Sequence, residues 1–420
     1  MELTIRPFVT GLFLIQFMGI TLYSQLNTQW RGTDRTGQYP SENLLKEWPL
    51  EGPELLLHVD DLPSAYSSVV VQGGILYTTG ISEEKKELLT AIGPHGDLLW
   101  STVYGDAWSK SYRDARCTPT IEGNYAYVIS GSGDLACIDI RQGEVVWSLD
   151  GYSQFQGRYG NWGVAESPLI VDEKMIYTPC GNQTTMVALD KATGTLLWAS
   201  ESIQDQSAYV SPLLLERGGY KLIVTVTGNY VICVNAADGE IFWKLEYASI
   251  DKPMMGEDIN PVTPLAMGNE IFVTSGYNHT GLLLKMSDDY RSVSIKWKSS
   301  ELDVHHGGVV LVDGYLYGSN YTSIRNGDWI CLDWETGELQ YSHGWNGKGQ
   351  IIASEGLLIC YDERKGKVAL VTARPDQFEI ISEFGIEYGS GPHWSHPSIY
   401  DDKLYLRHGK SLLVYEIGAK

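Results

Sequence analysis

The strongest constraint on the fold is a turn motif that ends in an aromatic residue and recurs along the chain. Asp or Asn is followed four residues later by Gly and eight residues later by Trp in residues 139–147, 190–198 and 235–243. Residues 333–341 repeat the motif with a terminal Tyr, residues 96–100 keep its second half, and residue 297 keeps only the Trp. The slot for the aromatic residue therefore recurs every 40–54 residues, at positions 57, 100, 147, 198, 243, 297, 341 and 381, with Leu at 57 and Ile at 381.

The chemistry of this motif is that of a hairpin followed by a docking residue. The side chain of Asp or Asn can bond to the turn backbone, and Gly adopts the positive φ that the end of the turn requires. A large aromatic side chain at a fixed point after the turn can wedge neighbouring units together. The predicted docking residues are Trp100, Trp147, Trp198, Trp243, Trp297 and Tyr341.

A second hairpin precedes each motif, so each repeat is predicted to have four short strands and no helix. This hairpin is clearest in residues 169–177, 309–317 and 398–406, and turn residues mark it in the other five repeats. One such unit cannot bury both of its faces, and four-stranded units at this period are typical of a β-propeller. The sequence thus predicts an all-β chain that forms a single eight-bladed β-propeller of four-stranded antiparallel blades. An array of sandwiches or two smaller propellers is the alternative.

The two ends of the propeller are predicted to meet in the last blade. The last repeat lacks its outermost strand, and residues 53–59 have the pattern of that strand without a hairpin before it. An N-terminal strand that completes the last blade would close the ring and hide an edge. The predicted organisation is a secretory signal peptide over residues 1–24, a lead-in segment over 25–52 and the propeller over 53–420.

The signal peptide is predicted from the first 24 residues. Arg6 precedes an uncharged apolar run over residues 8–23, and Ser24 is a small residue suited to cleavage. The run is short for a membrane-spanning helix, although an uncleaved N-terminal anchor is the alternative. No other stretch approaches spanning length, so the mature chain is expected to have no transmembrane segment. The first cysteine is Cys117, so no lipid-carrying cysteine lies near the cleavage site.

Charge and cysteine content narrow the function classes. The chain has 31 basic and 52 acidic residues, a net charge of −21, which argues against binding to nucleic acid. The six cysteines form no Cys-x-x-Cys pattern, and Cys137, Cys233 and Cys331 each stand two residues before the Asp or Asn of the turn. A small buried residue suits that place, so these cysteines are predicted to be structural.

The form Asp-x-x-Thr-Gly-x-x-x-Trp at residues 190–198 resembles the tryptophan-docking motif of the pyrroloquinoline-quinone (PQQ) propeller superfamily. This superfamily includes quinoprotein alcohol dehydrogenases and BamB-type outer-membrane assembly lipoproteins. The resemblance covers residues 30–420. The opening at residues 30–32 and the stretches 160–168 and 305–308 are also similar to bacterial secreted PQQ-binding-like proteins. The resemblance implies a periplasmic or secreted protein, either free or peripheral to the outer membrane.

Candidate functional residues lie in the loops that precede the innermost strands. In a propeller these loops surround one mouth of the central channel, where several elements converge on a ligand. The candidate ligand-site residues are Arg116, Arg158, Trp162, Glu166, His305, His306, His393 and His396, and the fifth blade adds Glu257 and Asp258.

Two interpretations of these residues stay open. Histidine can serve in acid–base chemistry or as a metal ligand, arginine can clamp an anion, and tryptophan can stack on a ligand. Alternatively, these groups satisfy loop backbone and bind nothing. If the backbone is extended there, adjacent His305 and His306 point in opposite directions, so at most one faces the axis. The sequence assigns no metal.

Two functions follow from the resemblance. The first is a binding or scaffolding propeller for protein or carbohydrate partners, similar to the BamB type. The alternative is a PQQ-type oxidoreductase that acts on an alcohol or a sugar. Quinoprotein dehydrogenases typically carry a vicinal Cys-Cys pair over the quinone and a calcium site of Glu, Asn and Asp. This chain has no adjacent cysteines and no set that matches those ligands by motif, so no cofactor is assigned and PQQ belongs to the alternative only.

Overall fold

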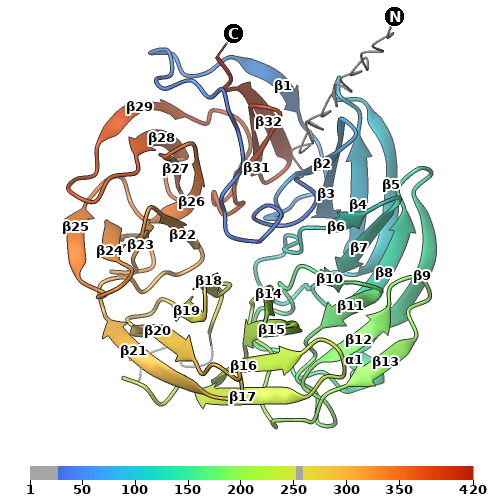
Figure 1. The fold of residues 1–420 in the computed structure, drawn as a ribbon. Helices are drawn as coiled ribbons and strands as arrows, with labels where there is room; N and C mark the ends of the chain where they lie inside the picture. The colour runs from blue at the N-terminus through green and yellow to red at the C-terminus, as the bar shows by residue number, and fades with distance from the viewer. Residues whose placement is uncertain (1–26, 252–258, 420) are drawn as a thin grey trace, which may run out of the picture.

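The computed structural model describes residues 27–251 and 259–419, and these form a ring of eight four-stranded antiparallel sheets (Figure 1). The predicted eight-bladed propeller is confirmed. The predicted signal peptide lies outside the described residues, as do Glu257 and Asp258.

The first four blades follow one another along the chain, and each runs from its innermost to its outermost strand. Blade 1 is β2 (Val70–Gln72), β3 (Ile75–Ile81), β4 (Lys86–Ile92) and β5 (Leu98–Asp106). Blade 2 is β6 (Thr120–Glu122), β7 (Tyr125–Ile129), β8 (Asp134–Asp139) and β9 (Glu144–Asp150). Blade 3 is β10 (Leu169–Val171), β11 (Lys174–Tyr177), β12 (Val187–Asp190) and β13 (Leu196–Ala199). Blade 4 is β14 (Leu213–Arg217), β15 (Tyr220–Val226), β16 (Tyr230–Asn235) and β17 (Ile241–Glu246).

The other four blades complete the ring. Blade 5 is β18 (Leu265–Met267), β19 (Glu270–Val273), β20 (Gly281–Met286) and β21 (Val293–Ser299). Blade 6 is β22 (Val309–Val312), β23 (Tyr315–Ser319), β24 (Trp329–Asp333) and β25 (Leu339–His343). Blade 7 is β26 (Gly349–Ser354), β27 (Leu357–Asp362), β28 (Lys367–Thr372) and β29 (Ile380–Gly385). Blade 8 is β30 (Ser398–Tyr400), β31 (Lys403–His408), β32 (Ser411–Glu416) and the N-terminal strand β1 (Leu55–Val59).

The ring closes as the sequence predicts. Strand β1 pairs antiparallel with β32, with Leu57 opposite Val414, and so supplies the outermost strand of blade 8. The described residues are nearly all β, with the single-turn helix α1 (Gly151–Phe155) after β9. Asp150 caps this turn because its side chain accepts a hydrogen bond from the backbone N–H of Ser153.

The hydrophobic core lies between the blades. Eight clusters of buried side chains are present, and each joins two neighbouring blades. The cluster between blades 4 and 5, for example, packs Val224 and Cys233 against Ile271 and Leu284. All six cysteines are free and buried. No blade has a core of its own, so the blades stabilise one another around the ring.

Four of the predicted docking residues reach into the following blade. The indole N–H groups of Trp100, Trp147, Trp198 and Trp297 donate hydrogen bonds to the carbonyls of Ile140, Lys191, Ala236 and Trp334, at 2.9–3.2 Å. Each indole also covers a turn glycine of positive φ, namely Gly143, Gly194, Gly239 and Gly337. A Cβ atom on any of these glycines would fall within 3 Å of the indole.

Trp243 and Tyr341 differ from these four residues. The buried indole nitrogen of Trp243 has no hydrogen-bond partner, and the next blade has Ser287–Ser292 in place of a glycine turn. The Tyr341 ring packs against Phe378 instead. Trp243 still packs in the cluster between blades 4 and 5. The motif thus donates an indole hydrogen bond to the next blade only where that blade keeps the glycine.

The lead-in segment runs into the centre of the ring, where Figure 1 shows its blue trace. The carbonyls of Asn27 and Thr28 accept hydrogen bonds from the innermost strands of blades 1 and 2. Arg31 donates to the carbonyls of Ile351 and Val309, in blades 7 and 6. Arg35 donates to carbonyls at the start of blades 3 and 4. These contacts on opposite sides of the ring show that the segment crosses the axis and closes the channel.

Candidate functional site

The loops that lead into the innermost strands are held together by a chain of small hydroxyl residues. The backbone N–H of Ser68 donates to Thr118 Oγ1 (2.9 Å), that of Thr118 to Ser167 Oγ (3.0 Å) and that of Ser167 to Ser211 Oγ (2.9 Å). In blade 8, His396 precedes a proline as Ser167 does in blade 3. His396 therefore lies at the axis, where its Nδ1 is 3.2 Å from the Arg31 guanidinium.

His305 and His306 come together instead of pointing apart. Their ring centroids are 3.7 Å apart, so the divergence expected for an extended backbone does not occur. The physical reason is that residues 305–307 bend and are not extended, because the strand β22 begins only at Val309. The backbone carbonyl of His306 also lies 2.8 Å from His396 Nε2. Three of the predicted histidines thus share one region of the mouth.

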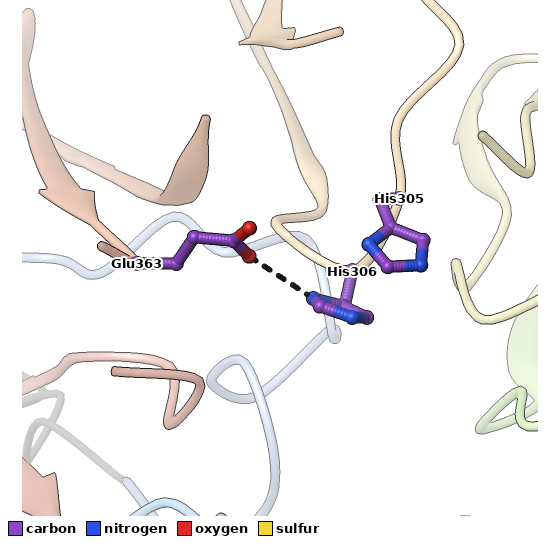
Figure 2. A group of neighbouring side chains, drawn as sticks. All are labelled: His305, His306 and Glu363. Atoms are coloured by element: carbon purple, nitrogen blue, oxygen red, sulfur yellow. Dashed lines mark ion pairs between the residues drawn. The ribbon is translucent and has the colours of Figure 1, made fainter. Parts of the chain in front are cut away.

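A carboxylate from the neighbouring blade completes this group. Glu363 follows β27, and its Oε2 lies 3.4 Å from His306 Nδ1 (Figure 2). The other carboxylate oxygen pairs with the buried ammonium of Lys348. His305 Nε2 lies 2.9 Å from the Tyr277 hydroxyl. We call His305, His306 and Glu363 the His–His–Glu cluster.

The environment of the cluster favours a neutral imidazole beside a charged carboxylate. Burial, followed by the proximity of His306 and Lys348, lowers the pKa of His305 well below its ordinary value. Burial alone would raise the pKa of Glu363, but His306 and Lys348 outweigh it and lower that pKa. The arrangement can therefore offer nitrogen lone pairs and a carboxylate to one ligand.

Aromatic side chains extend the mouth from this cluster to blade 2. The Trp394 ring lies 5.0 Å from the rings of His306 and Tyr66 and 5.3 Å from that of Tyr112. Arg116 donates to the carbonyls of Ser111 (3.0 Å) and Tyr112 (2.6 Å). Arg116 thus bonds to carbonyls of its own loop, as expected if these residues satisfy loop backbone and bind no ligand.

Among the remaining predicted residues, His393 touches the cluster, because its backbone N–H donates to the Glu363 carbonyl (3.2 Å). Glu166 is buried and accepts from the Thr178 backbone N–H (3.1 Å) and hydroxyl (3.4 Å), and burial raises its pKa to about 8 despite the opposing effects of Thr178 and Arg35. His393 is also buried and stacks on His408, and burial and then His408 lower its pKa to about 4.

Two further predicted residues belong to the loop that precedes blade 3. The Arg158 side chain is exposed, and its backbone N–H donates to the Pro179 carbonyl (3.0 Å). The half-buried Trp162 ring contacts the Tyr209 ring at 5.6 Å. Neither residue has a contact with the His–His–Glu cluster that the structure records.

Sequence reasoning missed Glu363 and Lys348. Lys348 directly precedes the innermost strand β26 and so lies in a loop of the predicted kind, whereas Glu363 does not. In an antiparallel blade, however, the second strand returns to the face where the first one began, so the hairpin between the second and third strands also reaches the mouth. Glu363 stands in that hairpin, between β27 and β28. The signal was available in the four-strand pattern itself.

The residues present do not fit the quinone site that the resemblance implies. No two cysteines are adjacent, and all six are buried and free. The channel axis is filled by the lead-in segment with its buried Arg31 and Arg35. No chemical step through PQQ is therefore derived. Among the described residues no helix is long and apolar enough to cross a membrane.

Comparison with known proteins agrees with this architecture. The model of the family described as "Outer membrane protein assembly factor BamB" matches residues 85–343, which is 259 of 420 residues. Two curated proteins carry the same description. The one from Moranella endobia is 24% identical over 190 residues, which is 44% of this chain and 42% of that protein. The one from Yersinia pestis is 23% identical over 194 residues, or 45% and 43%. The chain spans about two fifths of the length of these relatives.

Solved structures share the fold at low identity. BamB from Moraxella catarrhalis superposes with a TM-score of 0.59 at 14% identity, over 87% of this chain and 99% of that one. A europium-containing methanol dehydrogenase superposes with a TM-score of 0.67 at 12% identity, over 92% and 90%. At these identities the likeness is one of fold alone.

Proposed function

Because the chain belongs to the family described as outer membrane protein assembly factor BamB, we propose that it is an exported scaffolding propeller that helps to assemble outer-membrane proteins. It would act in the periplasm after removal of residues 1–24, and its partners would be proteins. Carbohydrate partners are a secondary expectation, based on the aromatic side chains around Trp394.

The observation that carries this proposal is a set of exposed apolar side chains on one side of the ring. Strands β5, β9 and β13 are the outermost strands of three successive blades, and each begins with an exposed apolar pair. The pairs are Leu98 and Leu99, Val145 and Val146, and Leu196 and Leu197, with exposed fractions of 43–63%. We call these six residues the apolar outer edge.

Beyond blade 3 the apolar outer edge is interrupted, whereas on its other side blade 8 continues it with the exposed Leu56. In blade 4 the equivalent Phe242 is buried, with the Arg291 guanidinium 3.7 Å above its ring. The second position of the pair is Lys296 in blade 5 and Gln340 in blade 6. Exposed outermost strands also present unpaired backbone groups to which a partner strand can add. A partner that supplies an extended apolar segment would match this edge.

The test is complementation in the organism that encodes the protein. Deletion of the gene is expected to lower the amount of folded outer-membrane proteins, and the wild-type gene should restore it. A triple variant Leu98→Glu, Val146→Glu and Leu197→Glu should restore little. The matched control, Ile295→Glu with Leu339→Glu on blades 5 and 6, should restore fully. Equal restoration by both variants, each folded by circular dichroism, would refute the proposed edge.

The oxidoreductase alternative is tested on the purified chain. PQQ and calcium are added, and dye reduction is followed with a panel of alcohols and sugars. The filled axis and the lack of a vicinal cysteine pair lead us to expect no turnover. Turnover that depends on PQQ would favour the alternative.

A further inference from the structure

We propose that the His–His–Glu cluster is a binding site for a single zinc-like divalent cation, with His305 Nδ1, His306 Nδ1 and Glu363 Oε2 as its ligands. One nitrogen of each histidine and one oxygen of Glu363 lie within 4.8 Å of one another. Imidazole and carboxylate together suit Zn²⁺, whereas Ca²⁺ and Mg²⁺ prefer oxygen ligands alone. Three protein ligands leave a fourth position open for water or another ligand.

The distances are close to those that a tetrahedral ion needs. Bonds of about 2.0–2.1 Å to zinc place two tetrahedral ligands about 3.4 Å apart. The distance between His306 Nδ1 and Glu363 Oε2 is 3.4 Å. Figure 2 shows the His305 ring beside these two groups. The ligand atoms all lie within 4.8 Å of one another, so closure of the site needs the His305 ring to move closer, which a side-chain rotation supplies.

The hydrogen bonds around the cluster leave the ligand atoms free. The Nδ1 atom of His305 is buried and has no hydrogen-bond partner, and the buried Nδ1 of His306 faces only the Glu363 carboxylate, at 3.4 Å. Buried polar atoms are normally satisfied, so the unpartnered His305 Nδ1 beside the long His306–Glu363 contact indicates a missing ligand. The other nitrogen of His305 is bonded to Tyr277. An outer-shell bond of this kind fixes which nitrogen of a histidine faces a metal.

Access and charge also fit a cation. A surface hollow of about 570 Å³, lined by Tyr321, Ile324 and their neighbours, adjoins the site through the Tyr321 ring, which is 5.2 Å from the His305 ring. Glu363 supplies negative charge: its Oε2 faces His306, while its Oε1 pairs with the Lys348 ammonium. Lys348 therefore limits the affinity of the site without occupying Glu363 Oε2.

The first experiment measures zinc binding by the tag-free mature chain after removal of metals with a chelator. Titration calorimetry with ZnCl₂ should give one ion per chain, and Co²⁺ should give the visible absorption bands of a tetrahedral site. Ca²⁺ and Mg²⁺ should give no binding. The absence of a tag matters because a histidine tag would bind zinc itself.

Variants then identify the ligands. His306→Ala and Glu363→Gln should each weaken zinc binding by about 100-fold or more, since they remove direct ligands, and Tyr277→Phe by about 10-fold, as an outer-shell partner. The control His95→Ala removes an exposed histidine in the turn between β4 and β5 and should leave binding unchanged. Thermal melting of each variant without zinc separates loss of the site from loss of the fold.

The Lys348→Met variant should change the zinc affinity in the opposite direction. Removal of the ammonium should strengthen zinc binding by about 10-fold, because the full charge of Glu363 becomes available. Zinc binding that is equal in wild type, His306→Ala and Glu363→Gln would overturn the proposal, as would no binding at all. Either result would leave the cluster as an ion pair of Glu363 with Lys348 and, when protonated, His306. The outcome is independent of the complementation test, which measures outer-membrane proteins in cells.

Discussion

Replacement of Arg35 by Ala should destabilise the whole propeller, because this side chain joins two blades at the axis. The guanidinium is buried and donates to the carbonyls of Ser167 (3.1 Å), Pro212 (3.0 Å) and Pro168. Bonds from a charged donor contribute about 1.5–3 kcal/mol each. Truncation to Ala also removes the desolvation cost of burying the guanidinium charge, which offsets part of this loss. We therefore expect a net loss of about 3–5 kcal/mol in the free energy of unfolding.

The assay is chemical unfolding followed by tryptophan fluorescence, with the midpoint and slope compared among three variants. Arg35→Lys should fall between wild type and Arg35→Ala, since an ammonium cannot reach three carbonyls at once. Arg374→Ala is the control, because Arg374 is partly exposed and pairs only with Asp376 and Glu379, contacts that contribute about 1 kcal/mol or less. If Arg35→Ala costs no more than Arg374→Ala, the lead-in segment does not hold the ring and our reasoning is wrong.

Three further outcomes are expected. Gly239→Ala should lower the free energy of unfolding by about 1 kcal/mol more than Gly219→Ala does. Both glycines have φ near +80°, so the backbone strain is similar, but only Gly239 lies under an indole. Equal losses would contradict the role of that contact. Leu57→Asp should lower the melting temperature by several degrees, while Leu56→Asp, at an exposed position of the same strand, should not; a similar effect of both would argue against closure through β1. Burial raises the pKa of Glu166 to about 8, so its proton stabilises the fold fully below about pH 4.5 and this contribution is lost as pH rises to about 8. Glu166→Gln should therefore flatten the fall in melting temperature between about pH 5 and pH 9, and an unchanged fall would refute the assignment.

The propeller could be predicted from the sequence because its signals are local. The spacing of Asp190, Gly194 and Trp198 defines a turn and the strand after it without reference to the rest of the chain. The closure by β1 was also predictable, since the last repeat lacked its outermost strand and residues 53–59 had the pattern of that strand without a hairpin before it. In each case a pattern within one repeat, or its absence, was enough.

The site could be predicted only in part because it depends on contacts between repeats. Nothing near His306 in the sequence points to Glu363, which lies 57 residues later and belongs to another blade. The paired orientation of His305 and His306 depends on a bend that has no turn signature of its own. The path of Arg31 and Arg35 across the axis depends on carbonyls that come from four blades.

The filled axis limits how a ligand can reach the site. Residues 27–39 are bonded to the innermost strands on both sides of the axis, so we expect a ligand to reach the His–His–Glu cluster from the face of the hairpin that carries Glu363. The apolar outer edge lies on blades 1–3, across the ring from the cluster on blades 6 and 7 (Figure 1). A partner on the outer edge therefore does not cover the cluster, and each surface can be changed while the other stays intact. It follows that zinc should bind equally well to the wild type and to the triple outer-edge variant, and that His306→Ala should complement as the wild type does if scaffolding depends on the outer edge alone.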